Sequence, residues 1–210
     1  GERPAGVLGG AAFTPNGLLT DLGGTNWTTL DLKSVWRPQG YGGANQVSAG
    51  LHGDEYVLDN PTWRTAAADD AGTVDGLYTA GRGRTRTYAL WLEDAWRFAP
   101  GWLLTLGGRY ERWRASDGFN FSGATAVRQP VETADAFSPK LSLQWDLAPR
   151  WRITGSLAKA VRFPTVGELY QLVSTGATFS VPDPDLKPER VRSGELAVEH
   201  GLDEGQLRLS

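Results

Sequence analysis

Hydrophobic and polar residues alternate along most of this chain, and a period of two is typical of β-strands. Leu141, Leu143 and Trp145, for example, alternate with Ser142 and Gln144. No segment shows the longer period of an amphipathic helix, so we predict an all-β protein. The alternation predicts eight strands, over residues 25–36, 45–56, 85–98, 102–114, 137–147, 151–160, 192–200 and 206–210.

The connections between these predicted strands alternate between short and long. In order along the chain they are about 8, 28, 3, 22, 3, 31 and 5 residues long. In an antiparallel meander all the short connections then fall at one end of the sheet and all the long ones at the other. That segregation is typical of transmembrane β-barrels, whereas structureless loops beyond about 12–15 residues are uncommon in compact domains.

Aromatic residues mark two heights on the predicted sheet. Tyr88, Tyr110 and Phe137 lie eight residues along their strands from a Trp at a short turn. At about 3.3 Å per residue, this tilted step covers roughly the 25 Å between the two membrane interfaces, where aromatic girdles are found. The alternative is that Trp flanks turns in any β-protein. The residues beside short turns are Trp36, Trp96, Trp102, Trp145 and Trp151.

One residue departs from this pattern. Asp94 falls on the same predicted face as Leu90, Leu92 and Trp96, which we assign to lipid. Either Asp94 lies near the short-turn rim, where a charge on the lipid face costs least, or a β-bulge shifts the register there. With that exception, the pattern predicts an antiparallel, up-and-down segment of a transmembrane β-barrel.

Composition is compatible with this fold but does not decide it. The mean hydropathy of −0.35 resembles that of a soluble protein, and the sequence has no apolar run long enough for a transmembrane helix. A transmembrane strand needs only about 9–11 residues, half of which can be polar. The absence of Cys excludes a disulfide framework, and a net charge of −3 does not indicate a nucleic-acid binder. No signal peptide is visible, and we expect the N-terminus of the full protein to lie upstream.

Four motifs follow one another in a recognisable order: YALWLEDAW at 88–96, SPKLSL at 138–143, AVRFPTVGELY at 160–170 and PDLKPER at 184–190. Together they resemble the barrel of TonB-dependent outer-membrane receptors over about residues 25–210. Two mild departures are the direct junction of Phe163 to Pro164 and Asp183 in place of the usual Asn. The residues that match most specifically are Phe163, Pro164, Glu168, Leu169, Tyr170, Pro184, Asp185, Leu186, Lys187, Pro188 and Glu189.

The resemblance implies a location in the Gram-negative outer membrane and a barrel of about 22 strands with a plugged lumen, of which eight strands form about a third. Residues 1–24 would be a loop remnant and 25–210 a partial barrel, with the plug domain upstream. The implied partners are outer-membrane lipid and lipopolysaccharide, the TonB complex through the missing N-terminal part, and a small-molecule metal chelate. No cofactor and no nucleic acid are implied.

The resemblance also ranks the imported ligands. Haem receptors of this family carry a ligating His in the segment that corresponds to 163–185, and this chain has none there. A ferric siderophore therefore ranks ahead of haem, vitamin B12 or a carbohydrate.

Three other classes of protein stay open at this stage. A passive porin would lack the plug, and a closed eight-stranded barrel would fill its own interior, although the last predicted strand, 206–210, is too short to span a membrane. An outer-membrane enzyme would need a nucleophile beside a histidine. His52 and His200 lie on different strands, and neither has a nucleophile or metal-ligand spacing near it. We therefore predict no enzyme.

Candidate ligand contacts lie in the long connections. Arg82, Arg84 and Arg86 form a cationic cluster whose planar guanidinium groups suit carboxylate and catecholate oxygens. The alternative is that these arginines bind lipopolysaccharide phosphates or are merely solvated. Aromatic residues that could stack on flat ligand rings are Trp63, Phe119, Phe121, Tyr170 and Phe179.

The remaining polar candidates have structural explanations. Asp183 and Asp185 could suggest a calcium site, but the sequence PDPD more simply predicts a stiff turn, so we predict no metal. The luminal side of the strands should carry cross-strand polar ladders. Their predicted members are Arg109, Glu111, Gln144 and Arg152.

Overall fold

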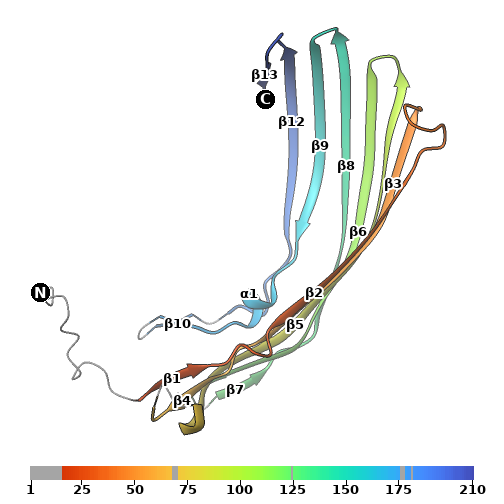
Figure 1. The fold of residues 1–210 in the computed structure, drawn as a ribbon. Coiled ribbons are helices and arrows are strands. Elements are labelled where there is room, and N and C mark those ends of the chain that lie inside the picture. The colour runs from red at the N-terminus through yellow and green to blue at the C-terminus, as the bar shows by residue number, and fades with distance from the viewer. Residues whose placement is uncertain (1–15, 68–70, 124, 176–177, 181) are drawn as a thin grey trace, which may run out of the picture.

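The computed structural model describes residues 16–67, 71–123, 125–175, 178–180 and 182–210, and most of them form one curved antiparallel sheet (Figure 1). Its main path is β2-β3-β5-β6-β8-β9-β12-β13, in which each strand pairs with the next. All eight predicted strands are present in the predicted order. Their bounds are β2 (Asn26–Trp36), β3 (Asn45–Asp59), β5 (Val74–Ala99), β6 (Trp102–Ser122), β8 (Glu132–Ala148), β9 (Trp151–Arg162), β12 (Glu189–Gly201) and β13 (Gln206–Leu209).

The two ends of the sheet differ as the connection lengths predict. Short turns join β2 to β3, β5 to β6, β8 to β9 and β12 to β13 at the upper rim in Figure 1. Within the described ranges β2 and β13 do not pair with each other, so the sheet is open and the closed eight-stranded barrel is not formed.

The long connections at the lower rim are not structureless, and this corrects the prediction of eight strands without a helix. Besides a 3₁₀ turn at residues 71–73 they contain one short helix, and no helix in the described part of the chain is long and apolar enough to cross a membrane. The elements in these connections are β4 (Thr62–Thr65), β7 (Thr125–Arg128), α1 (Val166–Tyr170), β10 (Val173–Thr175) and β11 (Thr178–Ser180). A further strand before β2, β1 (Gly17–Thr20), pairs with β4.

One face of the sheet, which we call the outward face, carries a band of exposed apolar side chains across its membrane-spanning part. Cross-strand partners lie on the same face of a sheet, and one row of partners crosses five strands with exposed fractions of 49% to 57%. So large an exposed apolar surface marks contact with lipid. The row consists of Leu32, Leu51, Leu90, Tyr110 and Phe137.

Asp94 lies on this outward face without a bulge beside it. It pairs in register with Val47 and Leu106, and the nearest register shift toward the turn lies between Trp96 and Ala99. The Asn45 amide donates a hydrogen bond of 2.8 Å to the Asp94 carboxylate. Proximity to the short-turn rim is therefore the correct one of the two explanations that the sequence left open.

The short-turn rim carries the predicted aromatic girdle. The rings of Trp102 and Trp145 stack with centroids 4.9 Å apart. Phe98 lies 5.5 Å from Trp96 and 5.9 Å from Trp102, so that the contact runs across three strands. Offset and tilted aromatic pairs of this kind contribute about 0.5–1.5 kcal/mol beyond their burial.

Two strands are longer than the alternation predicts: β5 has 26 residues and β6 has 21. A membrane needs only about 9–11 residues per strand, so both continue beyond the lipid at the long-connection rim. The sequence there, including Gly81 to Arg86, lacks apolar alternation because no lipid face has to be covered. Backbone pairing continues between β5 and β6 through this extension.

Candidate functional site

The chain after β9 turns inward and places α1 against the concave, luminal face at the long-connection rim (Figure 1). The Thr165 hydroxyl accepts a hydrogen bond of 3.2 Å from the Glu168 amide, and the Glu168 carboxylate accepts one of 2.9 Å from the Thr165 amide. This reciprocal pair is a capping box. A helix of five residues is not stable alone, so its packing on the sheet must hold it in place.

Two side chains of α1 supply that packing. Leu169 and Tyr170 are 0% and 1% exposed, and they contact Leu58, Trp113 and Ala115 of β3 and β6. Burial of one such side chain stabilises by about 1.5–3 kcal/mol. The helix is therefore fixed to the luminal wall by its C-terminal half.

The ring of Tyr170 lies in a socket of glycines. A Cβ atom at Gly118 would come within 2.5 Å of the ring, and a Cβ at Gly83 would overlap it outright. The Asn120 amide donates a hydrogen bond of 2.8 Å to the Tyr170 carbonyl. Only residues without a side chain allow β5 and β6 to approach the ring so closely. We call Gly83, Gly118 and Asn120 the Tyr170 socket.

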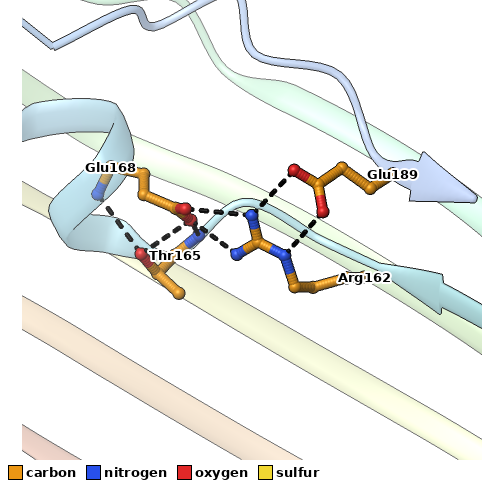
Figure 2. Close-up of polar contacts among 4 residues, drawn as sticks. All are labelled: Arg162, Thr165, Glu168 and Glu189. Atoms are coloured by element: carbon orange, nitrogen blue, oxygen red, sulfur yellow. Dashed lines mark hydrogen bonds and ion pairs between the residues drawn. The ribbon is translucent and has the colours of Figure 1, made fainter.

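Arg162, the last residue of β9, joins both ends of the connection from β9 to β12. Its guanidinium donates hydrogen bonds of 3.0 Å to both carboxylate oxygens of Glu168 and to both of Glu189, the first residue of β12 (Figure 2). The planar guanidinium matches two carboxylates in this bidentate manner, which a lysine could not do. We call these three residues the Arg162 clamp.

The clamp keeps its carboxylates ionised. The Arg162 guanidinium and, next, the amide of Thr165 lower the pKa of Glu168 from 4.5 to about 2. Arg162 also lowers the pKa of Glu189. The Glu168 side chain is 38% exposed, so solvent screens the pair and its contribution to stability is modest. The clamp therefore serves mainly to define geometry.

A small luminal cavity of about 290 Å³ lies between the sheet and the segment that leads into α1. Its acidic side chains are already paired: Asp54 lies 3.0 Å from His52, and Glu111 lies 2.8 Å from Arg109. The ring of Trp113 forms one wall of the cavity and stacks on the ring of Phe163, with the ring centroids 5.7 Å apart. The cavity is lined by Asp54, Tyr56, Thr85, Thr87, Glu111 and Trp113 from the sheet.

The predicted cationic cluster is not at this cavity. Arg86 pairs in register with Glu55, and no register shift separates it from Leu90, so it shares the outward face. Arg86 contacts the Glu55 carboxylate, Arg84 lies 3.4 Å from the same group, and Arg82 lies 2.7 Å from Asp59. The arginines are thus ion-paired, and their contact with an imported ligand stays a prediction.

The predicted aromatic residues are also dispersed. Phe119 is the cross-strand partner of Arg82, Phe121 follows it in β6, and Trp63 lies in β4. Tyr170 belongs to α1, and its burial in the socket leaves no face of its ring free for a ligand. Phe179 belongs to β11, and its side chain lies outside the described residues.

The family motifs, in contrast, do come together. Phe163 to Tyr170 and Pro184 to Glu189 meet at the Arg162 clamp. The amide of Asp185 donates 2.9 Å to the Asp183 carboxylate, which supports the stiff turn, and no group of three metal-ligating side chains occurs in the described residues. Sequence reasoning missed Arg162 and the two socket glycines. The only available signal was the Thr165-x-x-Glu168 spacing of a capping box.

The predicted polar side chains on the luminal face are paired. Arg152 contacts Asp146 across two strands at 2.7 Å, and Gln144 donates to the same carboxylate at 3.4 Å. Arg109 pairs with Glu111 along one strand at 2.8 Å. The luminal face therefore carries a polar network, partly across strands as predicted and partly along one strand.

The sequence is similar to one protein family and to individual members of known function. The sequence matches the family described as "TonB dependent receptor-like, beta-barrel" over residues 5–210. The "Ferric enterobactin receptor" of Pseudomonas aeruginosa is 27% identical over 219 residues, which cover 94% of this chain and 26% of that protein. The "Iron-regulated outer membrane virulence protein" of Vibrio cholerae is 28% identical over 121 residues, or 56% of this chain and 16% of that protein. The chain thus spans about a quarter of the length of the first relative.

Solved structures show the same fold. The ferric yersiniabactin uptake receptor FyuA from Yersinia pestis superposes with a TM-score of 0.62 at 16% identity, covering 92% of this chain and 28% of that one. The copper transporter OprC also gives 0.62, at 17% identity over 84% of this chain and 28% of that one. At such identities the likeness concerns the fold alone.

Proposed function

Because this chain belongs to the TonB dependent receptor-like β-barrel family, we propose that it forms part of the wall of an outer-membrane receptor that imports a ferric siderophore. The observation that carries the proposal is the similarity over 94% of the chain to a protein named for ferric enterobactin. A second relative is named for its regulation by iron. Members of the family are receptors and transporters, and we expect no catalytic step.

The proposal includes parts beyond this chain. Residues 25–210 would form about a third of a barrel of about 22 strands, with a plug domain upstream that contacts the TonB complex. The polar luminal face would contact that plug. Import would then depend on energy delivered through TonB, whereas the alternative, a passive porin, would conduct without it.

The luminal site supports a role in shaping the mouth of such a barrel. The Arg162 clamp and the Tyr170 socket hold α1 against the luminal face at the long-connection rim. In a closed barrel we expect the connection from β9 to β12 to narrow the opening at that rim. Loops placed by a rigid scaffold are where binding residues concentrate. We therefore expect selectivity to reside in this connection and its neighbours.

Uptake of radiolabelled ferric enterobactin tests the proposal. The full-length gene would be expressed in an iron-starved Gram-negative strain that lacks its own siderophore receptors, with and without TonB. Uptake that needs both the gene and TonB would support the proposal. Uptake without TonB would favour the porin, and uptake of a copper chelate alone would assign a different ligand.

A further inference from the structure

The luminal cavity beside the segment that leads into α1 contains buried hydroxyl groups that the fold does not use. Thr85 and Thr87, successive luminal positions of β5, line the cavity and are 3% and 9% exposed. Neither hydroxyl forms a hydrogen bond with another residue in the described part of the chain, unlike the Thr165 hydroxyl at the same cavity. Buried polar side chains are normally hydrogen-bonded, so these two hydroxyls indicate an occupant from outside this chain.

Two carboxylates at the cavity are each paired through only one of their oxygens. The Asp54 carboxylate contacts His52 through Oδ2, and the Glu111 carboxylate contacts Arg109 through Oε1. Among the described residues, the second oxygen of each carboxylate has no hydrogen-bond donor. Both side chains are largely buried, with exposed fractions of 15% and 12%. An ionised carboxylate accepts hydrogen bonds at both oxygens, so each can bind a further donor from an occupant.

The surroundings of the cavity carry an excess of negative charge. The charged side chains that line it and their ion-pair partners comprise five carboxylates, two guanidinium groups and one imidazole, so the excess is at least two negative charges. Such an excess attracts a cation and repels an anionic chelate. The basic groups are those of His52, Arg109 and Arg162. The carboxylates are those of Asp31, Asp54, Glu111, Glu168 and Glu189.

The cavity has room for one arm of a ligand but not for a whole chelate. Its volume is about 290 Å³, whereas pockets for drug-sized ligands measure about 300–1,000 Å³. Trp113, Phe163 and Val166 give it an apolar side, which suits the methylene groups of a flexible arm. The strands that line it, β3, β5, β6 and β9, each have a neighbouring strand on both sides. The cavity is therefore not a product of the open edges of the sheet.

We propose that this cavity binds a primary ammonium group on a flexible arm of the imported ferric chelate. An ammonium group is a compact cation with three N–H donors. The second oxygens of Asp54 and Glu111 and the two threonine hydroxyls supply acceptors for these donors. Long connections of such barrels face the outside of the cell, so the cavity lies toward the end where a ligand enters. This role of the cavity rests on the proposed function and narrows the substrate class to siderophores that carry an amine.

Two ferric chelates that differ in this one charge test the site. Ferrioxamine B is a trihydroxamate chelate with a terminal ammonium group, and N-acetylation makes that group neutral. Full-length receptor purified in mild detergent would be titrated with each chelate, and binding followed by quenching of tryptophan fluorescence. The ammonium form should bind at least about tenfold more tightly, because its hydrogen bonds to carboxylates are charge-assisted. Combining Asp54→Asn with Glu111→Gln should abolish this preference and leave the affinity for the acetylated chelate unchanged.

Two further variants separate the cavity from the general charge of the lumen. Glu93→Gln is the matched control, because Glu93 contacts Lys140 on the luminal face and does not line the cavity. It should keep the full preference for the ammonium form. Combining Thr85→Val with Thr87→Val keeps the shape and charge of the cavity but removes both hydroxyls, and should reduce the preference several-fold. Heat-modifiable migration in gels shows that each variant folds.

Equal affinity of the wild type for the two ferrioxamines would overturn the site, as would a preference that survives Asp54→Asn with Glu111→Gln. If that double variant lost affinity for both chelates equally, the occupant would be a cationic side chain of the plug domain, and the ammonium site would also be wrong. Binding of ferric enterobactin but of neither ferrioxamine would contradict the ammonium site and leave the proposed function intact. Uptake of none of these chelates in the presence of TonB would contradict the proposed function itself.

Discussion

The membrane-spanning part of the sheet and its long-connection rim are ordered by different kinds of contact. In the spanning part each side chain is placed by its own strand, because alternation decides which face it occupies. At the rim, α1 is held by contacts between residues that are far apart in sequence. Arg162, which binds Glu168 of α1, also binds Glu189, which lies 27 positions further along the chain. The wall is thus specified locally, while the mouth depends on a few long-range contacts, each of which can be removed singly.

The largest expected effect is on the wall. Leu92→Arg places a charge in the middle of the outward face, where Leu92 is 57% exposed, and should destabilise the full-length barrel by about 2–4 kcal/mol. Leu186→Arg makes the same change at the rim and should cost less than about 0.5 kcal/mol. Urea titrations of the protein folded into lipid vesicles would measure both. Equal effects would remove the distinction between the two regions.

The next effect concerns the Tyr170 socket. Gly118→Val introduces atoms where the Tyr170 ring lies and should expel α1 at a cost of about 1–3 kcal/mol. Limited proteolysis would show faster cleavage between β9 and β12, while the barrel stays folded. Gly155→Val, where nothing lies within 4 Å, is the control. Adding Tyr170→Ala to Gly118→Val should restore part of the lost free energy if the clash is the cause.

A smaller effect should follow loss of the Arg162 clamp. Arg162→Gln removes the ion pairs with Glu168 and Glu189 but leaves the capping box and the socket in place. We expect backbone amides of α1 to exchange hydrogen several-fold faster, with barrel stability changed by less than about 1 kcal/mol because the pairs are exposed. Arg152→Gln on the same strand should leave exchange at α1 unchanged, and an equal response there would show that the clamp is not specific.

The smallest effect is the dependence of α1 on pH. The pKa of Glu168 is lowered from 4.5 to about 2, so its contribution to stability is complete above pH 4.5 and is lost as the pH falls from 4.5 toward 2. The protection factors of the α1 amides, which remove the intrinsic pH dependence of amide exchange, should fall through that interval in the wild type. In Glu168→Gln the protection factors should be lower at neutral pH and should change less with pH. A wild-type profile that is flat down to pH 2 would contradict the assignment.

The same contrast explains what the sequence could predict. The strands of the wall follow from residues such as Leu141 and Ser142, whose alternation is forced by lipid on one side and water or protein on the other. The helix α1 is too short to show a period, and the Thr165-x-x-Glu168 spacing of its capping box is a signal that the sequence carries but that our prediction did not use. The roles of Arg162 and Gly83 could not be predicted, because each depends on a partner, Glu189 or Tyr170, that folding brings from another part of the chain.

The Arg162 clamp also divides one long connection into two parts with different tolerance to change in length. Tyr170 and Glu189 are both fixed to the wall, so the chain between them is a closed loop with stationary ends. The entropy cost of closing such a loop grows slowly, by about 0.6 kcal/mol for each doubling of its length. Insertions after Tyr170 can therefore accumulate at little cost in stability, whereas a single insertion between Arg162 and Glu168 would separate the guanidinium from the carboxylate. The loops at the mouth can therefore grow in length after Tyr170 but not between Arg162 and Glu168.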